Sequence, residues 1–488
     1  MSRSLASAVG TVFSGRIIII LTTAVVTPVL TRTLGASLYG QYATIFAISE
    51  VLKVVMTSGI NGGAKKYFSE DRSITRWKDH VWASYVRISL LIAGVVFTTV
   101  VLLYITGIFS VFISSTYAQL FLLLGIFLSV LQFRSLSFST LMGLKLEKYS
   151  EPIKVSEKLL FGCTAVGLSV LGYGVVGVLT GHILSATISL LICVLIIRKR
   201  VDMKFIIKRS PKNFPKNELL KYGYGSAIYM TLLYSLYHVD ILLLQAFTVE
   251  QTVGYYKAAL TIIGFMWLLP QSLQLVLIQS VSNMWNENRI AEINRMSAKL
   301  TRYVFLLTFL MSIGLVILGE IFIPFYFGND FTPAVTPLLV LLPGAICFSI
   351  TRPYLAITSA KGNLRPLIIA TAVAALINLL LNLLLIPRYG MIGAAIGTST
   401  GYASLLGTQL LCARYVGYNP ISGIRPIRIL TTGIVTYIAL RVFSPLLPTD
   451  VYRLLLIPLL GGIVFAGVAI VTGAIPFSDL RAIKRKAK

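Results

Sequence analysis

The sequence predicts an all-α polytopic membrane protein with about 14 transmembrane helices. Two features of its composition support this fold class, since 56% of the 488 residues are hydrophobic and only 12% are charged. The mean hydropathy of +0.84 agrees, because so apolar a chain has more apolar surface than one water-soluble core can bury. A third feature is the recurrence of apolar runs of roughly 20 residues, the length that a helix needs to cross about 30 Å of hydrocarbon.

These runs place transmembrane helices along the whole chain. Strands are a poor alternative, because a lipid-spanning sheet must close into a barrel and shows alternating segments of about ten residues. The first run resembles a signal peptide, but it contains Arg16 and continues to Leu30, so we expect an uncleaved helix. The expected spans are residues 10–31, 40–61, 83–107, 117–140, 156–171, 175–197, 221–247, 253–281, 302–325, 335–357, 364–386, 391–413, 426–446 and 453–474.

The Lys and Arg residues gather on one side of this topology. Of the 43, the loops assigned alternately hold 34 on the side of both termini and 4 on the other, and 5 lie within spans. By the positive-inside bias, both termini and the loop at 198–221 are expected in the cytoplasm. We therefore expect a multi-pass protein of the cell (plasma) membrane whose basic loops attract anionic membrane lipids.

The net charge of +26 does not indicate a nucleic-acid partner. The basic residues are spread over eight segments at helix ends rather than gathered on one folded domain. The 4 cysteines fall within predicted spans without paired spacing, and the 3 histidines are scattered. We predict no metal site and no cofactor from these residues.

Two glycine-rich turns repeat at a fixed spacing. Residues 171–181 read LGYGVVGVLTG and residues 387–397 read PRYGMIGAAIG, a shift of 216 positions. The pattern Gly172-x-Gly174-x-x-Gly177 matches a dinucleotide site, but such a site needs a soluble βαβ unit and an acid about 20 residues on, and ISLLICVLIIRKR contains none. We expect instead hairpin turns, each followed by glycines four apart that let two helices approach closely.

The repeat also predicts the domain organisation. The stretch GQYA at residue 40 is echoed by GYYK at residue 254, so six spans separate the copies and both halves cross the membrane in the same direction. Parallel repeats of this kind form the two lobes of some transporters. The predicted domains are an N-lobe at 1–200, a basic cytoplasmic linker at 201–220, a C-lobe at 221–420, and two further helices with a basic tail at 421–488.

Several stretches resemble one known family. Residues 240–258, DILLLQAFTVEQTVGYYKA, resemble the seventh and eighth helices of the polysaccharide and oligosaccharide-lipid flippases, and residues 378–395, NLLLNLLLIPRYGMIGAA, resemble their eleventh and twelfth. LTRTLGASLYGQYA and SGINGGAKKYFSED are similar to the start of the same family. The resemblance is to the multidrug/oligosaccharidyl-lipid/polysaccharide (MOP) exporter superfamily and covers residues 1 to about 420. It implies two six-helix lobes that move an isoprenoid-linked sugar to the external leaflet.

Charges within the spans are the candidates for binding the cargo phosphate, because a charge at bilayer depth is costly. Arg16 comes first, since a guanidinium binds phosphate with two parallel hydrogen bonds, although it can also snorkel to the interface. Lys53 either lines the lumen or neutralises Glu50, one turn before it. The other substrate-binding candidates are Arg134, Lys257, Asn378 and Asn382. The two asparagines either contact sugar or hold helices together.

Asp240 is the first candidate for ion coupling. Some exporters of the superfamily are driven by sodium or protons, and a carboxylate within a span can exchange such an ion between states. The alternative is structural, with a hydrogen bond from Tyr237 satisfying the carboxylate. Glu50 is the second candidate for ion coupling.

The expected function is therefore a flippase for a polyprenyl- or dolichyl-linked oligosaccharide, and we expect a transporter rather than an enzyme, acting as a monomer. A cation-coupled multidrug exporter would favour acids in its lumen, whereas the embedded charges weighed here are the bases Arg16, Lys53, Arg87, Arg134 and Lys257 against the acids Glu50 and Asp240. A membrane glycosyltransferase or ligase would need a sizeable extramembrane loop, and the expected external loops have only about 3 to 12 residues.

Overall fold

The structure, a computed structural model, describes residues 2–106, 115–421 and 423–476. Within these residues the regular structure is helical and contains no strand, which confirms the predicted fold class. Ten helices are long and apolar enough to cross a membrane, or eleven if the bent pair Glu250–Met266 and Leu268–Gln274 counts as one span.

Three of these stretches are long enough to cross the membrane twice. They comprise 53, 51 and 52 residues, and a helix of about 50 residues measures about 75 Å, against about 30 Å of hydrocarbon. Each contains a kink where the sequence predicts a short turn, at Gly35 (φ 67°), Gly172 (φ 88°) and Gly390 (φ 53°). Residues other than glycine rarely adopt these left-handed φ values, so glycine marks each reversal. With each kinked stretch counted as two crossings and the bent pair as one, the 14 predicted spans are accounted for.

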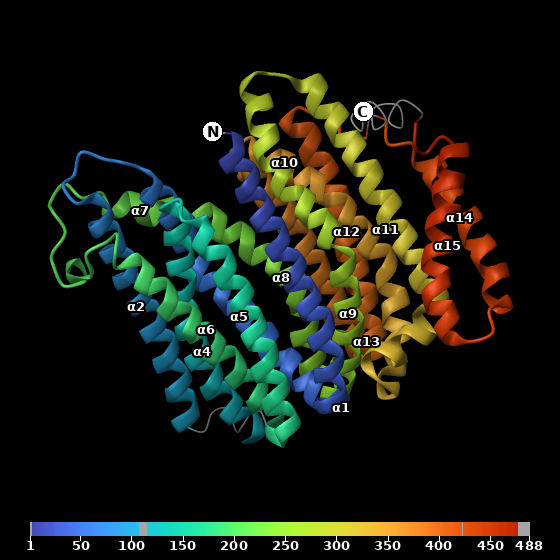
Figure 1. Ribbon diagram of the computed structural model, residues 1–488, viewed down its shortest axis with the longest axis horizontal. Helices are drawn as coiled ribbons and strands as arrows, with labels where there is room; N and C mark the ends of the chain where they lie inside the picture. Colours follow the sequence, from blue (N-terminus) through green and yellow to red (C-terminus); the bar gives the residue numbers. More distant parts are fainter. Residues whose placement is uncertain (1, 107–114, 422, 477–488) are drawn as a thin grey trace. The chain divides into compact units, whose positions relative to one another are not determined.

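The chain packs as two compact units, residues 1–242 and 243–488. The predicted lobe boundaries at 200 and 220 remain a prediction. Unit 1 contains the helices α1 (Ser2–Ser69), α2 (Trp77–Ile105), α4 (Ser115–Gly143), α5 (Glu147–Leu168), α6 (Gly174–Ile197), α7 (Lys216–Tyr222) and most of α8 (Tyr224–Phe247) (Figure 1).

In unit 1, α5 and α6 are in close contact beside the first glycine-rich turn. A Cβ added to Gly181 would lie 2.9 Å from the Ala165 nitrogen, and one added to Gly177 would lie 2.9 Å from the Leu168 Cβ. Real side chains do not approach that closely, so these glycines allow the two backbones to meet. This contact confirms the helix-packing interpretation of the first turn.

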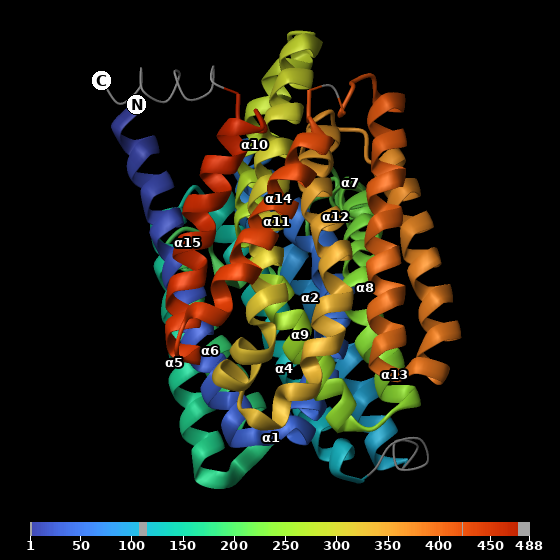
Figure 2. The same cartoon turned by 90° about the vertical axis from the view of Figure 1, so that its right-hand side faces the viewer.

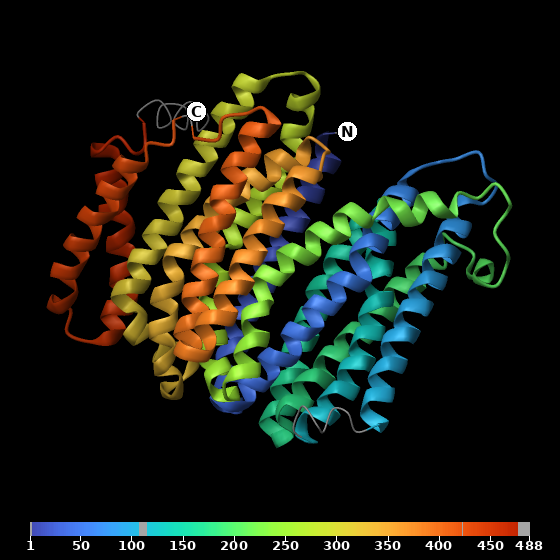
Figure 3. The same ribbon diagram turned by 180° about the vertical axis from the view of Figure 1, so that it is seen from behind.

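Unit 2 contains the remaining helices. They are α9 (Glu250–Met266), α10 (Leu268–Asn286), α11 (Ile290–Phe327), α12 (Val335–Ala360), α13 (Arg365–Val416), α14 (Pro426–Phe443) and α15 (Asp450–Val471). The helices α14 and α15 pack on α11 through an apolar cluster that includes Leu306, Ile317, Ile429 and Phe465 (Figure 2). The two arms of α13 run antiparallel on either side of Gly390 and are in view from behind in Figure 3.

The basic linker at 201–220 contacts the segment between α1 and α2 through ion pairs. Asp202 pairs with Arg76 at 3.1 Å, and Glu218 pairs with Arg72 at 2.8 Å. The Arg72 guanidinium holds the pKa of the Glu218 carboxyl below its usual range, and the Lys204 amide, with Arg76, does the same for the pKa of Asp202. At neutral pH both carboxylates are therefore ionised, as their ion pairs with arginine require.

Candidate functional site

Unit 1 contains a cavity of about 300 Å³ among α1, α4, α5 and α6. We call it the charged cavity, because six of its lining residues are charged. They are Glu50, Lys53, Arg134, Lys154, Glu157 and Lys158. Four cations and two carboxylates give the lining a net positive charge, which suits an anionic ligand.

Helical periodicity explains why these charges meet. Residues three, four and seven apart lie on one face of a helix, so each helix contributes one stripe of its sequence to the cavity. The stripes are Phe46, Glu50 and Lys53 on α1; Phe127, Leu131 and Arg134 on α4; Lys154, Glu157, Lys158 and Phe161 on α5; and His182 and Ser185 on α6.

Two lining cations are paired with lining carboxylates. Lys53 forms an ion pair with Glu50, one turn before it on α1. Arg134 on α4 donates to the Glu157 carboxylate on α5, with its Nη2 at 2.7 Å and its Nε at 2.8 Å. The carboxylate side chains are each 15% exposed, so both pairs are largely shielded from water. A buried pair keeps both charges in place at moderate cost, since neither is left uncompensated.

Lys158 differs from the other cations of the cavity. Lys154 pairs with Glu151 at 2.6 Å, whereas no carboxylate pairs with Lys158 within the described residues. The Lys158 Nζ lies 4.8 Å from the centroid of the Phe161 ring, which is a cation–π distance. A positive charge that forms no ion pair with the described residues, beside three paired cations, is suited to bind a phosphate group.

Aromatic rings surround His182 at one side of the cavity. The ring of His182 stacks on Phe161 with centroids 3.9 Å apart, and Phe127 lies at 5.2 Å. The Tyr42 hydroxyl is 3.2 Å from the His182 Nε2. These contacts hold the imidazole in one orientation at the wall of the cavity.

The structure brings three of the predicted site residues together. Glu50, Lys53 and Arg134 all line the charged cavity, and the predicted pairing of Glu50 with Lys53 is confirmed. The Arg16 side chain lies outside the described residues; its backbone precedes the lining residue Ile19 by one helical turn.

Asp240 also belongs to unit 1 but is not part of the cavity lining. It lies on α8, is 1% exposed, and its Oδ1 accepts a hydrogen bond from the Ile241 amide at 2.8 Å. Its predicted ion-coupling role remains a prediction.

The other predicted residues, Lys257, Asn378 and Asn382, belong to unit 2. Both asparagines are fully buried on α13, where Asn378 Nδ2 donates to the Gly397 carbonyl at 3.3 Å and Asn382 Nδ2 to the Asn378 carbonyl at 2.9 Å. The Asn378–Gly397 bond joins the two arms of α13, as the helix-packing interpretation expects. Sugar binding by the two amides, and phosphate binding by Lys257, remain predictions.

Sequence reasoning missed Lys154, Glu157, Lys158 and His182 as site residues. The predicted span at 156–171 began too late, because α5 already starts at Glu147. Lys154 therefore counts as a charge of a cytoplasmic loop, and Lys158, at the start of that span, is counted with the same cytoplasmic charges. The signal that identifies them is the spacing of Lys154, Glu157, Lys158 and Phe161, which places three charges and an aromatic ring on one helix face.

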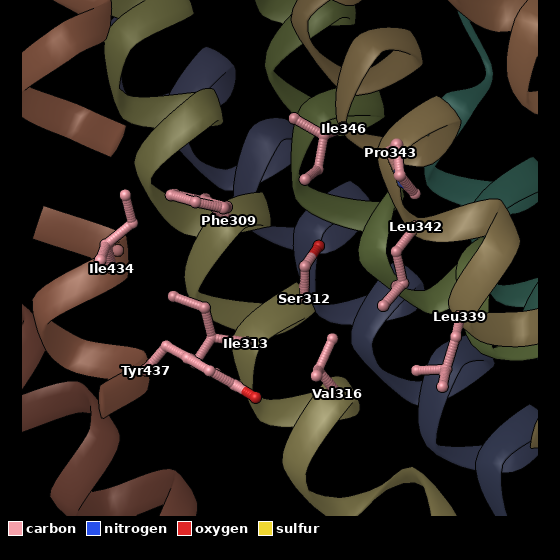
Figure 4. A pocket seen from close by; sticks show the side chains of 11 residues that line it. Phe309, Ser312, Ile313, Val316, Leu339, Leu342, Pro343, Ile346, Ile434 and Tyr437 are labelled. Carbon is pink, nitrogen blue, oxygen red and sulfur yellow. The ribbon is translucent and has the colours of Figure 1, made fainter. Parts of the chain in front are cut away.

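Unit 2 contains a second cavity of different character. Its volume is about 340 Å³, and the side chains in Figure 4 come from α11, α12 and α14. Apolar side chains such as Phe309, Ile313, Leu342 and Ile434 form most of its wall, and oxygens are supplied by Ser312 and Tyr437. None of its lining residues is charged, so it suits an apolar group rather than a phosphate.

The fold defines the class of protein, a multi-pass helical membrane protein. Residues 29–336 match the family described as polysaccharide biosynthesis protein, and the chain belongs to that family. A curated relative, the probable low-salt glycan biosynthesis flippase Agl15 of Haloferax volcanii, is 25% identical over 169 residues. The match covers 34% of this chain and 35% of that relative, so it spans about a third of the relative's length.

Solved structures of two membrane transporters have the same fold. The lipid II flippase MurJ in an inward closed conformation superimposes with a TM-score of 0.74 at 17% identity, covering 97% of this chain and 99% of that one. An inward-facing multidrug resistance MATE family transporter gives a TM-score of 0.63 at 13% identity, covering 82% of this chain and 98% of that one. At these identities the comparison shows a shared fold.

Proposed function

We propose that this protein is a flippase that moves an isoprenoid-(di)phosphate-linked oligosaccharide from the cytoplasmic to the external leaflet by alternating access. The observation that carries the proposal is the net positive cavity in unit 1, with Lys158 unpaired within the described residues and Lys53 and Arg134 beside it. Family membership supports it, because the product of such a step is used in polysaccharide or glycan biosynthesis.

The chemistry of the cargo matches the charged cavity. A lipid-linked sugar carries a phosphate or diphosphate, hydroxyl groups and a long apolar chain. Charge-assisted hydrogen bonds from Arg and Lys are the strongest phosphate contacts that a protein offers, and they strengthen in a shielded site. The charged cavity is large enough for a diphosphate. In this account Glu50 and Glu157 act as counterions of Lys53 and Arg134 when cargo is absent.

A second candidate function is a cation-coupled multidrug exporter with the same fold. A cationic drug would be bound by carboxylates, whereas the lining has four cations and two carboxylates, and both carboxylates are already paired. The charge balance therefore favours the anionic cargo. Deletion of the gene, followed by leaflet-resolved analysis of lipid-linked sugars, tests the choice. Normal appearance of the charged lipid in the outer leaflet would contradict the flippase.

Arg16→Ala is expected to abolish flipping while leaving membrane insertion intact. Arg16→Lys is expected to recover part of the rate, because lysine keeps the charge but loses the two parallel hydrogen bonds of the guanidinium. Flipping of a lipid-linked sugar in proteoliposomes, normalised to inserted protein, measures both variants. A wild-type rate in Arg16→Ala would remove this residue from the proposed site.

Ion coupling through Asp240 is part of the proposal. Asp240→Asn is expected to retain folding and cargo affinity, because the amide is nearly isosteric and still accepts the Ile241 hydrogen bond. Transport should lose its response to a sodium or proton gradient, since the site no longer changes charge between states. Flipping is measured in proteoliposomes with and without each gradient. An unchanged gradient response would exclude coupling at Asp240 and leave Glu50 as the candidate.

A further inference from the structure

A short stretch of the linker is held on α2 by one arginine. Arg87 donates to the backbone carbonyls of Phe205 at 3.0 Å, Ile206 at 2.8 Å and Lys208. Phe205 is 7% exposed, and its ring lies edge-on to His80 with centroids 4.9 Å apart. We call residues 204–209 the linker tip. Its backbone is fixed against α2 by these bonds.

The position of Arg87 along α2 places the linker tip at the edge of the bilayer. The preceding side chains, residues 81–86, are buried, and strongly exposed apolar side chains begin at Leu90 (52%) and Leu91 (68%) and end at Ile105 (72%). The 16 residues from Leu90 to Ile105 extend about 24 Å at 1.5 Å per residue, most of a hydrocarbon thickness of about 30 Å. Arg87, one turn before Leu90, therefore lies at the boundary between the hydrocarbon core and the lipid headgroups.

The outward face of the linker tip is apolar at its centre and basic around it. Ile207 is 92% exposed, more than any other large hydrophobic side chain described. The basic residues flanking it are Lys204, Lys208 and Arg209, all exposed. None of these three forms an ion pair within the described residues. The nearby carboxylate of Asp202 pairs with Arg76 instead. The linker tip therefore presents one strongly exposed apolar side chain among three exposed basic ones.

We propose that the linker tip is a binding site for anionic phospholipid. Ile207 inserts at the boundary between headgroups and acyl chains, while Lys204, Lys208 and Arg209 contact lipid phosphates. Basic side chains near an anionic surface attract it, and apolar side chains at the same level add burial. The Arg87 bonds hold the linker tip at the required depth. This site is separate from the charged cavity and does not depend on what the protein transports.

Tryptophan quenching by brominated phospholipids tests the proposal. Ile207→Trp in vesicles is expected to show quenching well above the wild-type background, and more with brominated phosphatidylglycerol than with brominated phosphatidylcholine. Neutralising the tip with Lys204→Gln, Lys208→Gln and Arg209→Gln should reduce the phosphatidylglycerol excess at least twofold. Raising the salt concentration should reduce it too, because salt screens exposed charges.

Two matched variants calibrate the result. Leu91→Trp on the apolar face of α2 should be quenched by both lipids alike, and Asn213→Trp, exposed elsewhere on the linker, should remain at background. The vesicles contain phospholipid alone, so the quenching cannot come from a lipid-linked sugar. Quenching of Ile207→Trp no greater than that of Asn213→Trp would overturn the site. Equal quenching by both lipids would leave a membrane contact but refute its preference for anionic lipid.

Discussion

Lys158→Gln is expected to lower the flipping rate of a phosphate-bearing lipid-linked sugar at least tenfold. Within the described residues, this lysine is the lining cation without a carboxylate partner, so its charge is available to the cargo. A hydrogen bond to a charged group contributes roughly 1.5–3 kcal/mol, which corresponds to about 10- to 150-fold in affinity. Initial flipping rates in proteoliposomes at low cargo concentration measure the loss.

The neighbouring lysines of α5 provide matched controls for this variant. Lys148→Gln lies on the same helix but outside the cavity lining, and Lys154→Gln removes a cation that Glu151 already neutralises. We expect a wild-type rate for Lys148→Gln and a smaller loss for Lys154→Gln than for Lys158→Gln. Equal losses at the three positions would indicate a general effect of charge and contradict a specific phosphate contact.

Gly393→Ala is expected to be the most destabilising alanine substitution in the second glycine-rich turn. A Cβ at this position would lie 2.3 Å from the Leu385 carbonyl oxygen and 2.5 Å from its carbon, both backbone atoms that cannot move aside. Overpacking of this kind costs roughly 1–3 kcal/mol and more when the backbone must shift. We expect a clear fall in the thermal unfolding midpoint of the purified protein and in the yield of inserted protein.

Gly407→Ala is the control, because it lies on the same helix with no atom within 4 Å of the added Cβ. Alanine is favoured over glycine in helices by about 1 kcal/mol, so an unchanged or slightly higher midpoint is expected. A midpoint for Gly393→Ala that matches that of Gly407→Ala would contradict the close approach of the two arms of α13.

The second glycine-rich turn repeats the geometry of the first, as the 216-residue shift predicts. A Cβ added to Gly397 would lie 2.8 Å from the Asn382 Oδ1. Gly397 is therefore in close contact with the facing helical arm, as Gly181 is with α5. Gly174 and Gly390 occupy the same left-handed region, with φ values of 51° and 53°. The sequence predicts these turns well, because a positive φ and a close backbone contact both favour glycine, and glycine is visible in the sequence.

The charged cavity was harder to predict than the spans. Span positions follow from the length and hydropathy of each segment, which are local properties. The cavity is assembled from four helices, so its composition depends on which face each helix turns inward. The pairing of Lys53 with Glu50 was predictable because both residues lie on one helix one turn apart. The pairing of Arg134 with Glu157 joins two helices. The predicted span at 156–171 starts after Lys154 and only two residues before Lys158, so both lysines are counted with the cytoplasmic charges.

The central claim is that the positive charge of this cavity binds the phosphate of the cargo. It is tested most directly by comparing the flipping of two lipids with the same sugar and the same isoprenoid chain, one with a diphosphate and one without. Proteoliposomes containing the wild-type protein should flip the diphosphate form and leave the neutral form at the rate of protein-free vesicles. Equal rates for the two lipids in the wild-type protein would contradict the account.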